Sequence, residues 1–285
     1  MNEKLKDYKE EVTAKLVSAL EQGTVPWRKP WTSSVPFNAV SGRPYNGINT
    51  VVLMMRGLEL DDGADPRWAT YLQAQEKGWQ IKKGAKGTRV TLWKNLVLPP
   101  EQEDQEGKTI MMHKLFTVFH ASQIEGIGEY QPAIKNELES NETAERLMLN
   151  SGAEIRHGGC KACYYPSEDY IMLPDKRDFH SASGYYATAL HELIHWTGHK
   201  TRLNRDLTGE KRSKSYAKEE LLAELGSMFL SRIAGIKQDE EVYSNHASYI
   251  SSWLKCLKED VNFVFKVSAE ASRAAEFLRD QKGAD

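Results

Sequence analysis

The chain has 285 residues, enough for two domains that each bury a core of their own. With 40% hydrophobic and 27% charged residues the composition is that of an ordinary globular protein, and no apolar run approaches the roughly 20 residues of a membrane-spanning helix, which excludes a membrane-embedded class. The formal net charge of −2 argues neither for nor against nucleic acid, and three cysteines do not make a disulfide framework. The first residues, MNEKLKDYKEEV, are charged and lack an apolar signal core, so we expect a cytoplasmic protein without a membrane partner.

Helical patterns dominate the beginning of the chain. Apolar residues at helical spacing predict a helix over 3–22. A proline-stiffened loop with Trp27 and Trp31 follows, and the apolar stretch from Asn49 onward predicts a buried helix. Residues 67–79, RWATYLQAQEKGW, are predicted to form another short helix.

A basic segment follows and predicts a strand. Gly84 and Gly87 permit tight turns, and the β-branched alternation of 88–93 indicates an extended backbone. The segment 109–124 would pair with this strand across an acidic loop, so we expect the first half to be α+β. The cations, with no acid between them, are Lys77, Lys82, Lys83, Lys86, Arg89 and Lys94.

Aromatic residues are interleaved with these cations. Five of the seven tryptophans, at 27, 31, 68, 79 and 93, lie in the first third of the chain. A sequence-tolerant single-strand binder needs this combination, because every base can stack on an aromatic ring while cations contact the phosphates. The alternative is that the tryptophans are core residues and that the basic hairpin is a solvated surface.

The chain changes character over 125–140, where apolar periodicity fades, and this is the predicted domain boundary. A helix is predicted at 142–151, followed by short strands at AEIRHGG and ACYYP. The segment DYIML predicts a third strand, which in a peptidase can lie above the metal and pair with an extended substrate. Cys160 and Cys163 form a C-x-x-C pair without a second pair, which we interpret as incidental, and we expect Cys256 in the core.

The stretch ATALHELIHWTG, residues 187–198, carries the motif H-E-x-x-H. On a helix, His191 and His195 lie one above the other on the same face and can share one metal ion. Glu192 lies next to the first ligand, where it can take a proton from a metal-bound water as the general base does in zinc peptidases. Leucine and isoleucine at helical spacing support the helix independently. The alternative is a helix that carries two histidines by chance.

Two histidines leave a metal ion short of protein ligands. The longer motif H-E-x-x-H-x-x-G-x-x-H fails, because Thr201 occupies the position of its third histidine. A helix predicted over 216–230 offers Glu220 and Glu224 one turn apart on one face. This pair resembles the second zinc helix of gluzincin-type peptidases, which implies Glu220 as the ligand and Glu224 as the hydrogen-bond partner of a ligand histidine. Exchange of the two roles, or two acids that only solvate the helix, are the alternatives.

Taken together, both halves resemble the ArdC-like antirestriction proteins of conjugative plasmids. The likeness rests on PWRKPW, GRPYNGIN, RWATYLQAQEKGWQIKKGAKG and VFHASQIEG in the first half, and on DYIMLP, YYATALHELIHWTGH and YAKEELLAELGSMFL in the second. It implies a two-domain α+β fold, with a single-stranded-DNA-binding domain at 1–130 and a zincin-like metallopeptidase domain at 131–285. It also implies that the protein shields incoming plasmid DNA from host restriction enzymes during conjugation.

The resemblance also implies a set of site residues. His191, His195 and Glu220 would hold the metal, with Glu192 as the base; zinc suits this donor set best, and manganese or another divalent ion is the alternative. The implied DNA contacts are Trp27, Trp31, Tyr45, Asn46, Trp68, Gln73, Lys82, Lys83, Lys86 and Arg89.

Three functions follow from these observations. The leading hypothesis is an antirestriction protein with a working metallopeptidase, whose protein substrate could be a host restriction enzyme or another protein. In the second, the metal only holds helices together and the protein coats DNA or masks restriction enzymes. In the third, the peptidase is an effector that acts on host proteins, and the first half localises it. The sequence makes no prediction of the oligomeric state.

Overall fold

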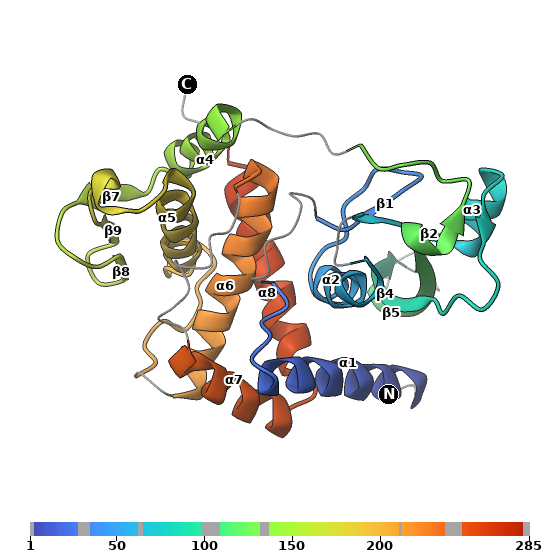
Figure 1. The fold of residues 1–285 in the computed structure, drawn as a ribbon. Coiled ribbons are helices and arrows are strands. Elements are labelled where there is room, and N and C mark those ends of the chain that lie inside the picture. The colour runs from blue at the N-terminus through green and yellow to red at the C-terminus, as the bar shows by residue number, and fades with distance from the viewer. Residues whose placement is uncertain are drawn as a thin grey trace, which may run out of the picture.

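The computed structural model describes residues 3–27, 35–61, 65–97, 109–131, 137–210, 213–236 and 247–281 (Figure 1). The elements of the first half are α1 (Glu3–Glu21), β1 (Phe37–Asn38), α2 (Ile48–Asp61), β2 (Arg67–Thr70), α3 (Tyr71–Glu76), β3 (Gln80–Ile81), β4 (Thr88–Val97), β5 (Thr109–His120), the 3-10 helix η1 (Ala121–Gln123) and β6 (Ile124–Glu125). Those of the second half are α4 (Glu137–Ser151), β7 (Glu154–His157), β8 (Cys163–Tyr165), β9 (Tyr170–Leu173), the 3-10 helix η2 (Lys176–Asp178), α5 (Ala182–Trp196), α6 (Lys214–Ala234), α7 (Ala247–Glu259) and α8 (Phe263–Arg279). None of these described helices is both long and apolar enough to cross a membrane. The α+β class is confirmed.

A four-stranded sheet in the order β1-β2-β5-β4 organises the first half. β4 and β5 pair in antiparallel fashion with Thr88 opposite Val118, which confirms the predicted pairing. The side chain of Asn49 on α2 donates to the carbonyl oxygen of Thr91 at 2.7 Å and accepts from the N–H of Thr91 at 2.8 Å. These two bonds fix α2 relative to β4. β3 and β6 form a separate two-stranded sheet.

The helix predicted over 67–79 is only partly correct. Arg67–Thr70 forms β2, which pairs with β5. The helix α3 begins after Thr70, whose hydroxyl accepts from the N–H of Gln73 while the Gln73 side chain accepts from the N–H of Thr70. Because the sheet uses the backbone groups of the first four residues, the helix starts only at this capping box.

Helix α1 precedes the sheet in sequence but packs on the second half of the chain. Nζ of Lys9 donates to Oδ1 of Asn262 at 2.7 Å, and the hydroxyl of Thr13 donates to the carbonyl oxygen of Val261 at 3.2 Å. Figure 1 shows α1 in blue beside α7. The largest hydrophobic core therefore combines the apolar face of α1 and Trp27 with the helices of the second half.

Helix α6 is the central helix of the second half and contacts α5, α7 and α8 (Figure 1). It is buried along most of its length. Gly226 lets α5 approach closely, because a Cβ atom at this position would lie 2.7 Å from Cδ1 of Ile194. This close packing sets the distance between the H-E-x-x-H helix and the glutamates of α6.

A three-stranded sheet in the order β7-β9-β8 lies beside α5. β9 is parallel to β7 and antiparallel to β8. The three short strands predicted for this part of the chain are confirmed.

Candidate metal centre and nucleic-acid interface

Helix α5 presents the two histidines of the motif on one face. Ser181 caps the first turn, because its hydroxyl accepts from the N–H of Gly184 at 3.0 Å. The apolar positions of the helix face the core, where Leu193 is fully buried. The Nε2 atoms of His191 and His195 lie 3.2 Å apart. Two imidazole nitrogens that meet at this distance need a proton or a cation between them.

Glu220 of α6 completes a cluster of three possible metal ligands. Its carboxylate oxygens lie 3.8 Å from Nε2 of His191 and 3.8 Å from Nε2 of His195. One ligand atom from each residue can be chosen so that all lie within 4.8 Å of one another. Two imidazoles and one carboxylate suit zinc or a similar divalent ion with a position left for water or substrate. Within the described ranges, the structure thus brings together the three residues predicted as ligands.

A second carboxylate, Glu219, supports one of these histidines. Nδ1 of His195 donates to Oε1 of Glu219 at 3.1 Å, which directs Nε2 at the cluster. Arg205 holds the same carboxylate through Nε at 3.0 Å and Nη2 at 2.8 Å. Glu219 was not among the residues predicted from the sequence. Its position directly before Glu220 could have identified it. Neighbouring residues of a helix point in directions about 100° apart, so two adjacent glutamates can reach different sides of one site.

The carboxylates control the protonation of this centre. Burial alone would lower the pKa of His195, but the hydrogen bond with Glu219 and the charges of neighbouring carboxylates raise it to about 9. Burial would raise the pKa of Glu219, but hydrogen bonds with His195 and Arg205 hold it below its ordinary value. The negative charge of these carboxylates therefore favours a proton or a metal cation at the Nε2 atoms of the two histidines.

Glu224 lies one turn after Glu220 and is 2% exposed. We expected Glu224 to form the hydrogen bond with a ligand histidine, but at His195 this bond is made by Glu219. At His195 it is therefore position 219 that faces the Nδ1 side of the ring. A supporting role of Glu224 elsewhere in the site stays a prediction.

Glu192 is oriented by the edge of the three-stranded sheet. Its Oε2 atom accepts a hydrogen bond from the backbone N–H of Tyr164 in β8 at 2.8 Å. We expected the DYIML strand to lie above the metal and pair with substrate, but that strand is β9, the central strand of the sheet. Both hydrogen-bonding edges of β9 are used within the sheet, so it cannot accept another strand. The edge strand beside α5 is β8.

The turn between β8 and β9 is fastened to the end of α5. The hydroxyl of Tyr164 donates to Oδ1 of Asp169 at 2.8 Å, and Nη1 of Arg202 donates to Oδ2 of Asp169 at 2.9 Å. Nε of Arg202 donates to the carbonyl oxygen of Trp196 at 2.7 Å, and the guanidinium carbon lies 3.7 Å from the centroid of that indole. This network holds Tyr164, and with it the N–H that Glu192 accepts, in one place.

Two phenols border the metal centre. The hydroxyls of Tyr216 and Tyr249 lie 3.1 Å apart. Burial and, to a smaller extent, the charge of Glu220 raise the pKa of each tyrosine, so both stay protonated at neutral pH. Neither was identified from the sequence as a site residue.

The cysteines stand apart from the cluster of possible ligands. Cys256 is 5% exposed and lies in the core, as predicted. Cys160 and Cys163 are exposed and not joined in a disulfide, and neither belongs to the three-residue cluster found among the described residues.

Two of the predicted DNA contacts are buried. Trp27 and Trp68 are each 1% exposed. The ring of Trp27 packs 6.1 Å from that of Trp253, and the ring of Trp68 packs 4.7 Å from that of His120, measured between centroids. Neither indole offers a face to a base, so these two assignments are corrected: the rings fill cores because they are large apolar groups. Trp31 lies outside the described residues.

The polar candidates lie nearer the surface. The exposed ones are Asn46, Lys82, Lys83 and Lys86. Tyr45 is half-buried, Gln73 is engaged in the capping box, and Arg89 is half-buried and pairs with Glu11. Tyr71, at the start of α3, was not predicted from the sequence. Its side chain is 58% exposed, so its ring is accessible to a base, unlike the rings of the buried tryptophans.

Two family models match the chain. One, described as the N-terminal domain of the anti-restriction factor ArdC, matches residues 6–119. The other, described as a zincin-like metallopeptidase, matches residues 142–270. The two matches leave unassigned the stretch in which the sequence predicts a boundary.

Relatives and solved structures are similar over nearly the whole chain. The DNA primase TraC of Escherichia coli is 41% identical over 98% of this chain, which spans only 27% of the length of that primase. The protein y4eC of Sinorhizobium fredii is 32% identical, with 97% of this chain and 92% of that protein covered. The metal-free crystal structure of the antirestriction ArdC protein from the R388 plasmid matches with a TM-score of 0.79 and 38% identity over 96% of this chain and 97% of that chain. Its Mn(II)-bound structure matches with a TM-score of 0.78 and 37% identity over the same shares.

Proposed function

Because the chain belongs to the ArdC antirestriction family, we propose that it binds single-stranded DNA and protects incoming plasmid DNA during conjugation, in the cytoplasm of the cell. The observation that carries this proposal is the match of both halves, in one chain, to an antirestriction ArdC structure at 38% identity. In the proposal, residues 1–130 bind the strand and residues 131–285 form a metal-dependent peptidase. A host restriction enzyme or another protein is its substrate.

His191, His195 and Glu220 would hold the metal, because their ligand atoms converge. Zinc is the ion that this donor set favours, and the Mn(II)-bound form of the R388 protein supports acceptance of other divalent ions. When bound, such an ion supplies Lewis-acid polarisation of a carbonyl group and makes water more acidic.

Glu192 is the proposed general base. Its place next to His191 brings the carboxylate to the cluster, and the N–H of Tyr164 orients one of its oxygens. The carboxylate would take the proton of the attacking water and pass it to the leaving amine. The edge strand β8 would lie alongside an extended peptide. The proposal therefore assigns substrate binding to β8 in place of β9.

Replacement of Glu192 tests the peptidase directly. Glu192→Gln keeps the shape of the side chain but removes the base, so we expect cleavage of a quenched fluorescent casein to fall by about 10²-fold or more while zinc stays bound. Glu168→Gln, an exposed position in the turn between β8 and β9, is the control. Loss of zinc from Glu192→Gln would assign this residue to the metal ligands, and unchanged cleavage would exclude it as the base.

A second function, in which the metal only joins helices, has one observation in its favour: the possible ligands lie on α5 and α6, two core helices. These helices, however, already pack through Gly226 and Ile194. The metal-free and Mn(II)-bound R388 structures also match this chain almost equally, with TM-scores of 0.79 and 0.78. Our proposal expects a chelator to abolish cleavage and leave the circular dichroism unchanged. Unfolding of the second half by the chelator would favour the structural role.

DNA binding should be measured on the full chain, because removal of residues beyond 130 would uncover the buried face of α1. We expect affinity for a labelled oligothymidine to fall steeply with salt and to vary little with sequence. Tyr71 is the proposed stacking residue, so Tyr71→Ala should weaken binding by about 1–3 kcal/mol, the worth of one stacked base. Tyr165→Ala, at a 40% exposed tyrosine of the second half, is the matched control. Equal affinity for duplex and single strand would contradict the stacking proposal.

A further inference from the structure

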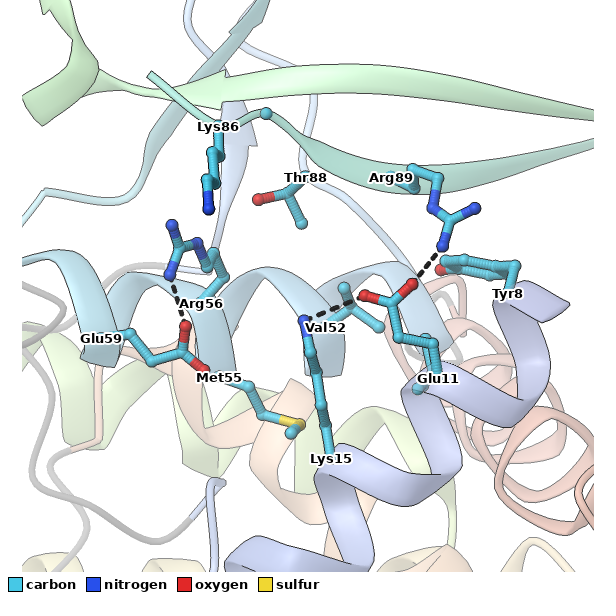
Figure 2. A pocket seen from close by; sticks show the side chains of 12 residues that line it. Tyr8, Glu11, Lys15, Val52, Met55, Arg56, Glu59, Lys86, Thr88 and Arg89 are labelled. Carbon is cyan, nitrogen blue, oxygen red and sulfur yellow. Dashed lines mark hydrogen bonds and ion pairs between the residues drawn. The ribbon is translucent and has the colours of Figure 1, made fainter. Parts of the chain in front are cut away.

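A pocket of about 310 Å³ opens between α1, α2 and the start of β4 (Figure 2). Its apolar lining comes from Val12, Val52 and Met55. Its charged lining consists of Lys15, Arg56, Lys86, Arg89, Glu11 and Glu59. Four cations against two acids leave this lining with a net positive charge. The volume lies at the lower end of the range of about 300–1,000 Å³ that is usual for small-molecule sites.

The cations of the pocket approach one another from different elements. Figure 2 shows the side chains of Lys86 and Arg56 pointing toward each other across the pocket. Arg56 pairs with Glu59 on its own helix, and Glu11 is shared between Arg89 and Lys15. Like charges that face each other repel, and an anion placed between them converts this repulsion into attraction. The charge arrangement thus favours an anionic ligand.

Two buried hydroxyls of the lining have no hydrogen-bond partner among the described residues. They are the phenol of Tyr8 and Oγ1 of Thr88. Tyr8 is 1% exposed, and burial raises its pKa well above the ordinary value, so the phenol is a hydrogen-bond donor. Figure 2 shows the hydroxyl of Thr88 directed to the side of the pocket where Lys86 and Arg56 meet. Buried donors without a partner are rare in folded proteins, and a ligand oxygen would supply the missing acceptor.

The wall that carries Lys86 is held in place before any ligand arrives. A Cβ atom at Gly87 would lie 2.3 Å from Cγ2 of Thr117, so only glycine lets this segment pass so close to β5. Nε2 of Gln123 donates to the carbonyl oxygen of Lys86 at 3.1 Å. The hydrogen bonds of Asn49 fix α2 on the opposite side. A site built in this way loses little conformational entropy on binding.

We infer that this pocket binds the phosphate group of a ligand the size of one nucleotide, with the phosphate between Lys86, Arg56 and the hydroxyl of Thr88 and the remainder of the ligand on the apolar lining. The phosphate can belong to a DNA strand, in which case the inference rests on the proposed DNA binding and locates part of that interface. It can also belong to a free nucleotide, in which case the inference is independent of it. Neither case involves the metal centre.

Calorimetric titration of the full chain tests the inference with thymidine 5′-monophosphate, and with thymidine as the ligand that lacks the phosphate. We expect one nucleotide to bind per chain and thymidine to produce no comparable heat. Arg56→Gln should weaken nucleotide binding by about tenfold or more, because it removes a charge-assisted contact. Arg177→Gln, at an arginine whose side chain is 84% exposed in the second half, is the matched control and should have no effect.

Thr88→Val separates a ligand contact from a structural role. The hydroxyl it removes has no partner among the described residues, so the variant should melt no lower than the parent protein while binding the nucleotide about threefold or more weakly. Nucleotide binding that neither Arg56→Gln nor Thr88→Val weakens would overturn the inference. An equal loss of nucleotide affinity in Arg56→Gln and Arg177→Gln would also overturn the inference, because it would show general electrostatic attraction. Binding of thymidine as tight as that of the nucleotide would overturn it as well.

A competition experiment identifies the source of the phosphate. If thymidine 5′-monophosphate displaces a labelled oligothymidine, and Arg56→Gln weakens both, the pocket takes a phosphate of the strand. If the nucleotide binds without displacing the strand, the ligand is a free nucleotide. If the strand binds, the nucleotide does not, and Arg56→Gln leaves the affinity for the strand unchanged, the pocket inference is wrong while the proposed DNA binding stands.

Discussion

The hydrogen bonds around Glu219 allow a quantitative prediction for Glu219→Gln. The carboxylate accepts from Nδ1 of His195 at 3.1 Å and from Arg205 at 3.0 and 2.8 Å. Glutamine has one acceptor oxygen and no charge, so the variant leaves the guanidinium of Arg205, whose side chain is 9% exposed, without its counter-charge. Removing one partner of a buried ion pair costs about 3–5 kcal/mol, and removing a support of a ligand histidine costs about 10–100-fold in metal affinity.

Both losses can be measured on the same samples. Urea unfolding in the presence of chelator gives the change in stability, and competition with a fluorescent zinc chelator gives the change in metal affinity. Glu259→Gln is the control, because the side chain of Glu259 is 41% exposed and its ion pair with Lys214 lies at the surface, where solvent screens such pairs and they contribute little to stability. Wild-type zinc affinity in a folded Glu219→Gln protein would refute the role assigned to Glu219.

Two further predictions concern pH and packing. Because the pKa of His195 is raised from 6.5 to about 9 in the metal-free fold, protonation of this ring stabilises the fold fully below pH 6.5, and the contribution is lost as the pH rises through 9. The melting temperature of the chelated protein should fall over this window, and a flat profile would contradict the assignment. Gly226→Ala should destabilise the fold by about 1–3 kcal/mol in urea unfolding, because its Cβ would meet Ile194 at 2.7 Å; unchanged stability would show that α5 can move away at no cost.

The sequence predicted the metal cluster because its information is local. His191 and His195 are four residues apart on one helix, so helix geometry alone puts them on one face. Glu220 required a second helix, and the apolar pattern of that helix predicted it. For the three predicted ligands to meet, the two helices then only had to pack against each other.

The parts that the sequence did not predict depend on contacts between distant segments. Glu219 differs from its neighbour Glu220 only by a turn of about 100° around the helix, and which acid faces Nδ1 of His195 depends on how α6 lies against α5. β9 was expected to bind substrate, but strand order within a sheet cannot be inferred from the strands themselves. The sequence around Trp68 does not distinguish a ring that stacks on a base from one that fills a core. Its burial results from the pairing of β2 with β5.

The predicted boundary at 130 divides the chain by sequence position, but the largest hydrophobic core contains residues from both sides of it. Lys9 and Thr13 of α1 bond to residues that follow α7, and Trp27 packs on Trp253 of α7, so the first helix gains its stability from the second half. The same helix contributes Tyr8 to the pocket beside β4. Because most of the stability of a helix in a protein comes from tertiary packing of its apolar face, we expect that wall of the pocket to form only when the second half is folded. The proposed phosphate site is therefore a property of the whole chain, and a fragment that ends at the boundary would lack it.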